Sequence, residues 1–218
     1  MREDADGDGE PARDRLARTL RGEVEPACGV ALTASTDDLS LDVEGVGPVA
    51  FPVRPAQARE LLAFGQPARF GRGEETLTDR GLRDTSEIPK NLVRARWDDD
   101  VLDGILTTAK EELGLPIGAE LTADLHSLLG YEPGQFLLVH QGSGKDDSMI
   151  GTMVVTLPSG YTGGELVVCH LEVREVRSGY RIALTFLTPS RKPGVPSRIL
   201  RACRQERGRW GRQGRSHA

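Results

Sequence analysis

The C-terminal half of the chain is a succession of short β-rich runs separated by turns. Residues 121–129 alternate apolar side chains with small or polar ones, which is the pattern of a strand with one buried face. Further runs of strand-like composition cover residues 135–140, 149–157, 165–173 and 179–187, with the turn PSGYTGG between the middle two. Four or five strands in close succession predict a sheet that folds back on itself as a sandwich or a barrel.

The residues before this half favour helices and loops. The sequence predicts helices over residues 11–22, 55–65 and 97–114. The last is the strongest, because Asp98 or Asp99 can cap its first turn and Gly114 can end it. Residues 49–53 favour a short strand, whereas residues 66–96, rich in Gly, Arg, Asp and Thr, are expected to be mostly irregular. Helices followed by strands predict an α+β domain.

The length and the charge distribution predict one domain with two polar tails. A chain of 218 residues suits a single domain. Residues 1–10 carry five acids against one base, and the chain after Phe186 carries nine bases against one acid. We therefore expect a disordered acidic tail over 1–10, a domain over 11–187 with its core at 121–187, and a disordered basic tail over 188–218.

Composition also narrows the function classes. The formal net charge of −5 gives the body of the chain no general attraction to nucleic acid, so any such binding is expected to be weak and confined to the basic tail. There is no apolar run of membrane-spanning length and no secretory leader. The three cysteines are far apart and form no CxxC pair. We expect a cytoplasmic protein with reduced thiols and no membrane partner.

One strand-like run ends at His140 and continues directly into the glycine-rich loop Gln-Gly-Ser-Gly-Lys. A phosphate-binding loop is disfavoured, because Val139 stands where that motif needs its first glycine and Asp146 stands where it needs a hydroxyl. The remaining interpretations of His140 are a metal ligand and an ordinary core or rim histidine.

Two other residues extend the metal-ligand interpretation. His170 also ends an apolar run, and Arg181 alternates with Ala183 and Thr185 along the last strand. An arginine among small side chains is typical of a carboxylate-binding site, and an exposed strand face is the alternative. Two imidazoles beside a carboxylate-binding arginine indicate a non-haem iron centre.

Three phrases of the sequence occur together in a known family. They are YEPGQFLLVH at 131–140, MIGTMVVTLPSGYTGGELVV at 149–168 and EVREVRSGYRIALTF at 172–186. In this order they resemble the Fe(II)/2-oxoglutarate dioxygenases of the prolyl 4-hydroxylase type. That family has a Tyr-x-x-Gly-x-x-aromatic-x-x-His-x-Asp strand, then a Leu-Pro…Gly-Gly-Glu-Leu hairpin, then a Ser-Gly-x-Arg segment.

The resemblance implies a fold and a site. The fold is a double-stranded β-helix core of the jelly-roll or cupin type, supported by N-terminal helices. Fe(II) would bind His140 and His170, and 2-oxoglutarate would bind Arg181 and Tyr131, with ascorbate as a reductant. The partners implied are oxygen and a substrate that is either a protein side chain or a small molecule.

Three features of the chain depart from the family pattern. Gly142 stands where the family has its aspartate ligand, leaving Asp146 and Asp147 as the nearest substitutes. His170 lies one residue before the expected place of the distal histidine, and a shift of one residue turns a strand side chain to the other face. The segment before His170 is also shorter than in the family, so we expect missing strands and unpaired sheet edges.

These departures leave the function open between three hypotheses. The first is a 2-oxoglutarate-dependent oxygenase with an impaired metal site. The second is an inactive remnant of the fold that acts as a binding module. The third is a halogenase-like variant in which Gly142 leaves a ligand position for halide.

Overall fold

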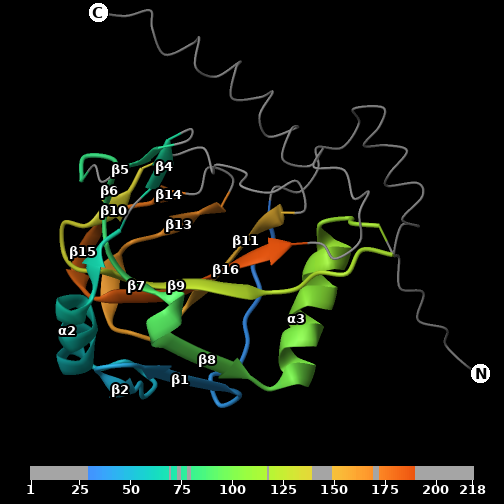
Figure 1. Cartoon of the computed structure of the whole chain (residues 1–218), viewed down its shortest axis with the longest axis horizontal. Coiled ribbons are helices and arrows are strands. Elements are labelled where there is room, and N and C mark those ends of the chain that lie inside the picture. Colours follow the sequence, from blue (N-terminus) through green and yellow to red (C-terminus); the bar gives the residue numbers. More distant parts are fainter. Residues whose placement is uncertain are drawn as a thin grey trace, which may run out of the picture.

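The centre of the protein is a five-stranded antiparallel sheet. The structure is a computed structural model that describes residues 29–68, 70–72, 75–77, 80–116, 118–138, 149–168 and 172–189. The strand order is β11-β16-β9-β7-β3, and it joins segments far apart in the sequence (Figure 1). The bounds are β11 Met149–Thr156, β16 Arg181–Pro189, β9 Asp124–Tyr131, β7 Ser86–Pro89 and β3 Gln66–Pro67.

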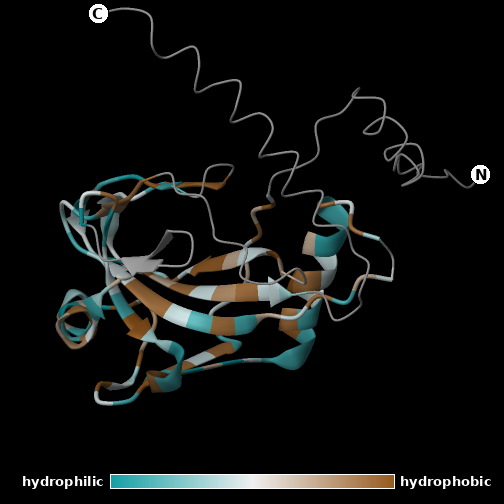
Figure 2. Cartoon of the chain, turned by 45° about the horizontal axis from the view of Figure 1, so that its top comes forward, coloured by the Kyte–Doolittle hydropathy of each residue, from teal (hydrophilic) through white to brown (hydrophobic). Residues whose placement is uncertain are grey.

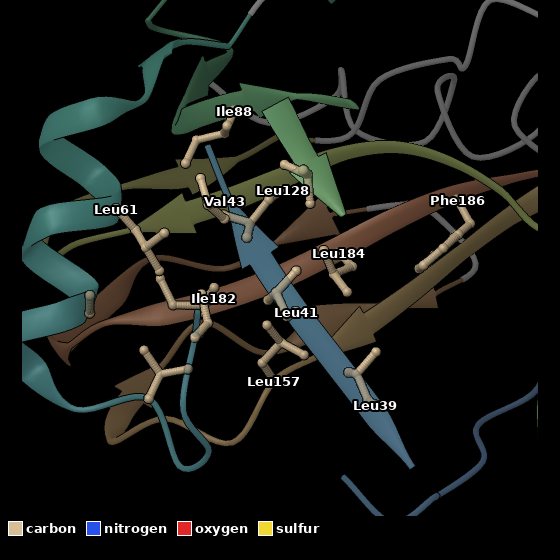
Figure 3. Close-up of a cluster of buried hydrophobic side chains, with 14 residues drawn as sticks. Leu39, Leu41, Val43, Leu61, Ile88, Leu128, Leu157, Ile182, Leu184 and Phe186 are labelled. Atoms are coloured by element: carbon tan, nitrogen blue, oxygen red, sulfur yellow. The ribbon is translucent and has the colours of Figure 1, made fainter. Parts of the chain in front are cut away.

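One face of the central sheet packs against a small three-stranded sheet of order β2-β1-β8. Its strands are β1 Leu39–Val43, β2 Gly47–Pro48 and β8 Val93–Trp97. Alternate apolar residues of β1 and β16 point into the space between the two sheets, and helix α2 (Pro55–Phe64) adds Ala58 and Leu61 (Figure 3). This first core contains the side chains of Leu39, Leu41, Val43, Ile88, Leu128, Ile182, Leu184 and Phe186, among others.

The other face of the central sheet is covered by a four-stranded sheet of order β13-β14-β10-β6. These strands are short: β13 Leu166–Val167, β14 Glu172–Val173, β10 Phe136–Leu137 and β6 Arg83–Asp84. The ladder β12 (Tyr161–Gly163) with β15 (Val176–Gly179) lies beside them. A second core lies here, made of Leu129, Tyr131, Leu137, Val173 and Val176. The molecule therefore has three layers of sheet (Figure 1).

The expected helix before the sheet is present as α3 (Asp99–Glu112). The Asp98 carboxylate caps it by accepting a hydrogen bond of 3.1 Å from the backbone N–H of Asp100. The helix ends where Gly114 takes a φ of +64°. Figure 2 shows hydrophobic residues gathered on the long strands and hydrophilic ones on the helices and outer loops.

The prediction of a mixed α+β fold is confirmed, with mostly antiparallel strands and two α-helices in the described residues. Those sheets do not close into a barrel. The helix expected over 11–22 lies outside the described residues. No helix of the described part is long and apolar enough to cross a membrane.

Three predicted elements were wrong. Residues 66–96 are largely strands, namely β3, β4 (Phe70–Arg72), β5 (Glu75–Leu77), β6, β7 and β8, with a 3₁₀ turn at Lys90–Leu92. Residues 49–53 form no continuous strand, and only Val53 makes an isolated bridge, to Ser159. The single strand expected over 165–173 is two strands, because β13 and β14 pair with each other. Strands of two to four residues carry too little periodicity to be recognised locally.

Candidate functional site

Arg181 is the most unusual side chain in the described part of the protein. It opens strand β16 and is only 1% exposed, and it lies on the face of the central sheet that bears the second core. A charged residue is almost never fully buried unless it is paired. Its guanidinium group therefore marks a site.

Two groups of the described residues contact this guanidinium. Nη2 donates a hydrogen bond of 3.0 Å to Oγ1 of Thr156, at the end of β11. Cζ lies 5.4 Å from the centre of the Tyr131 ring, since Tyr131 is directly opposite Arg181 in the pairing of β9 with β16. Nε is buried and has no hydrogen-bond partner in the structure. These two contacts hold the side chain in place, while the N–H group at Nε has no acceptor.

The alternation along β16 explains how the sequence places this residue. Ile182 and Leu184 point into the first core, so Arg181 and Ala183 point to the opposite face. Both faces of the strand are buried from Arg181 to Phe186. The alternative that this arginine lies on an exposed strand face is therefore wrong.

The same face carries a buried pair of hydroxyl groups farther along the sheet. Oγ of Ser127 and Oγ1 of Thr185 are 3.0 Å apart, and Oγ1 of Thr185 also donates to the backbone oxygen of Ser127 at 3.2 Å. Ala183 lies between Thr185 and Arg181 and adds only a methyl group. Along β16 this face therefore carries small or polar side chains, next to the apolar Leu129 on β9.

Gly164 allows the chain to pass close over Arg181. Its φ is +66°, and a Cβ atom built there would lie 2.9 Å from Cγ2 of Val176 and 3.1 Å from Cδ of Arg181. Its backbone N–H donates to the carbonyl of Glu175 at 3.0 Å. Any larger residue would press on the arginine stem. The Gly-Gly pair in the sequence was a signal for this approach.

Thr156 was missed by the sequence interpretation. It is the last residue of a β-rich run, and nothing in its local sequence separates it from the other threonines there. Only the register of β11 with β16 brings it to Arg181. Thr156 is exposed while Arg181 is buried, so the side of β11 is where the site lies nearest to solvent.

The expected metal ligands His140 and His170 lie outside the described residues, and so do Gly142, Asp146 and Asp147. Within the described part no three His, Cys, Asp or Glu side chains are grouped to hold a metal ion. Of the predicted site residues, the structure thus brings together Arg181 and Tyr131.

A surface depression of about 320 Å³ lies elsewhere, along β10 and β14. Its lining residues are Phe136, Leu138, Glu172, Val173, Arg174 and Glu175. Val173 also belongs to the second core, and the Glu175 carbonyl accepts from the backbone N–H of Gly164.

Comparison with known proteins adds no identification: no family model matches the sequence, and no curated protein matches it. The buried Arg181 and the groups around it are therefore the basis for assigning a function.

Proposed function

We propose that this chain is a 2-oxoglutarate-dependent oxygenase of the prolyl 4-hydroxylase type, in which Arg181 binds the distal carboxylate of 2-oxoglutarate. The observation that carries the proposal is the buried guanidinium whose Nε has no partner. The double-stranded β-helix belongs to the same proposal. Its support is the pair of facing sheets on either side of the second core.

The energetics of burial favour an anionic ligand at this place. Removing a guanidinium from water costs several kcal/mol unless an opposite charge compensates it. In the described residues the groups that contact Arg181 are a hydroxyl and an aromatic ring, and neither carries a negative charge at neutral pH. A carboxylate would supply the missing charge and accept from the unused donors of the planar fork.

The described residues fit 2-oxoglutarate in three respects. Arg181 can bind one carboxylate through two N–H groups, and Thr156 fixes the guanidinium by accepting from Nη2. The ring of Tyr131, on the neighbouring strand β9, limits the movement of the Arg181 side chain. Ala183 and Thr185, the next residues on this face of β16, add only small side chains beyond Arg181. These side chains bind and orient the ligand and exclude water from its buried end.

The iron ligands of this proposal are His140 and His170, with Asp146 or Asp147 as the carboxylate in place of Gly142. Iron, when bound, supplies the oxygen activation on which this class of reaction depends. The substrate is a protein side chain or a small molecule that reaches the site from the side of β11.

Ligand binding by the full-length chain tests the arginine assignment. We expect 2-oxoglutarate to bind, in calorimetry without oxygen, and Arg181→Lys to weaken its binding by about tenfold or more, because lysine keeps the charge but loses the bidentate fork. Arg94→Lys on β8 is the matched control, since Arg94 is exposed on another sheet. Equal affinity in wild type and Arg181→Lys, with both variants folded by circular dichroism, would contradict the assignment.

A second measurement separates catalysis from binding alone. With Fe(II) and oxygen, an active oxygenase should convert 2-oxoglutarate to succinate, and Gly142→Asp should raise both iron affinity and succinate formation. Binding of 2-oxoglutarate without succinate from either protein would instead favour the non-catalytic binding module.

A further inference from the structure

Among the described residues, strand β11 has a neighbouring strand on one side only. It is the first strand in the order β11-β16-β9-β7-β3, so β16 is its neighbour on one side only. In the described residues no backbone hydrogen bond or isolated bridge reaches the other side of Met149–Thr156. From Gly151 to Thr156, after the register shift at the start of the strand, alternate residues direct their N–H and C=O groups to the free side, where they can pair with another strand.

The other edges of the three larger sheets in the described part are protected in ways that β11 is not. Strands β2, β3, β6 and β13 have only two residues each. Strand β8 is longer, but it carries the exposed charges of Arg94 and Arg96. Short length and charge are the usual means by which proteins keep sheet edges from pairing. The sequence of β11, MIGTMVVT, has neither charge nor proline.

The side chains of β11 also leave apolar surface to be covered. Ile150, Met153, Val154 and Val155 are only half-buried, although the neighbouring strand β16 is buried on both faces from Arg181 to Phe186. Val and Ile favour a paired and packed strand. Both the apolar side chains of β11 and its outward-facing N–H and C=O groups therefore favour pairing with another strand.

No other strand of the described residues lies along the outer edge of β11. Described residues 29–35 form no strand. The sequences of 1–28, 139–148 and 190–218 are dominated by charge, glycine and proline, and none contains an uncharged β-rich run of this length. A second copy of the chain carries the same uncharged, β-rich edge strand β11. Every copy in solution can therefore supply the strand that pairs with this edge.

We propose that two copies of this chain pair through β11, antiparallel and related by a twofold axis, so that their central sheets form one continuous sheet. A twofold axis perpendicular to the sheet pairs each residue with one on the same face. The two registers with the greatest overlap then place Thr152 opposite or diagonal to Thr152 of the partner subunit. No like charges meet in either register, because the strand has none.

This pairing also affects the site around Arg181. Thr152 and Thr156 are exposed residues of β11, and Thr156 is the hydroxyl that holds the guanidinium. A partner strand would fix the free side of β11 and extend the wall of the site. The pairing itself does not depend on which ligand Arg181 binds.

The oligomeric state of the full-length chain tests the proposal. We expect a dimer in sedimentation equilibrium, and we expect Thr152→Lys to raise its dissociation constant by roughly tenfold, because two lysines then face each other across the new ladder. Thr107→Lys on α3 is the matched control, since this exposed threonine lies on a helix away from the edge, and it should remain dimeric.

Charge exchange distinguishes pairing from loss of folding. Thr152→Glu alone should dissociate as Thr152→Lys does, and an equimolar mixture of the two should recover a dimer at least as tight as wild type. A wild-type chain that is monomeric throughout would overturn the proposal. So would a Thr152→Lys protein that stays dimeric, or a Lys and Glu mixture that forms no heterodimer.

Discussion

At Gly164 a single missing side chain shapes the site. The residue has a φ of +66°, and a Cβ atom there would crowd Val176 and Arg181. We expect Gly164→Ala to lower the free energy of unfolding by about 1–3 kcal/mol, because alanine adds both backbone strain and a close contact. Urea unfolding monitored by circular dichroism measures the change.

A helical glycine supplies the comparison. Gly104 lies in α3, and a Cβ atom built there meets nothing within 4 Å. Gly104→Ala should stabilise the protein by about 0.5–1 kcal/mol, because alanine is the better helix former. If both substitutions had the same effect, the crowding at Gly164 would not be the cause.

The sequence predicted some residues of the site and missed others. Arg181 could be singled out from the sequence because a strand has a period of two, and this arginine alternates with small side chains. Its burial and its contact with Tyr131 follow from the pairing of β9 with β16. Thr156 could not be found, because it reaches Arg181 through a register between segments 25 positions apart. The period of two along a strand shows on which face of the sheet a side chain lies. It does not show which side chains of other strands contact it there.

Among the helices and strands, α3 is the one whose formation is best explained by its own sequence. Asp98 accepts from the N–H of Asp100, and Asp99 and Asp100 follow in the first turn. We expect Asp98→Ala to cost about 0.5–2 kcal/mol of stability through the loss of the cap. Asp103→Ala, at an exposed position inside the helix, is the control and should change stability by less than about 0.5 kcal/mol. Equal losses in urea unfolding would contradict a capping role.

The strands show the limit of local prediction. The long strands β9, β11 and β16 were predicted because each carries enough residues to display composition or alternation. Strands β3 and β6 have two residues each, and their order comes from partners elsewhere in the chain: β3 pairs with β7, and β6 with β10. The whole segment around them is rich in Gly, Arg, Asp and Thr, so residues 66–96 were expected to be mostly irregular. Tertiary pairing overrides weak local preference in such segments.

Over the whole molecule, the order of elements predicted an α+β fold but not its three layers. The sheet of β1, β2 and β8 was not foreseen, because β8 comes from residues 66–96, which were expected to be mostly irregular. It nevertheless provides one side of the first core, where Leu39, Leu41 and Val43 lie against the central sheet (Figure 3). This layer leaves the opposite face of the central sheet to the second core and Arg181.

That arrangement makes the outer sheet part of one cooperative unit. Leu41 is 4% exposed in the first core, so Leu41→Ala should cost about 2–5 kcal/mol. Leu32→Ala, at a side chain that is 45% exposed, should change stability by less than about 0.5 kcal/mol. In a Trp210→Phe background, Trp97 on β8 is the remaining tryptophan and reports the outer sheet, while far-UV circular dichroism reports all sheets. Both signals should shift together in urea for Leu41→Ala. If tryptophan fluorescence shifted alone, the outer sheet would unfold separately from the layer that holds Arg181.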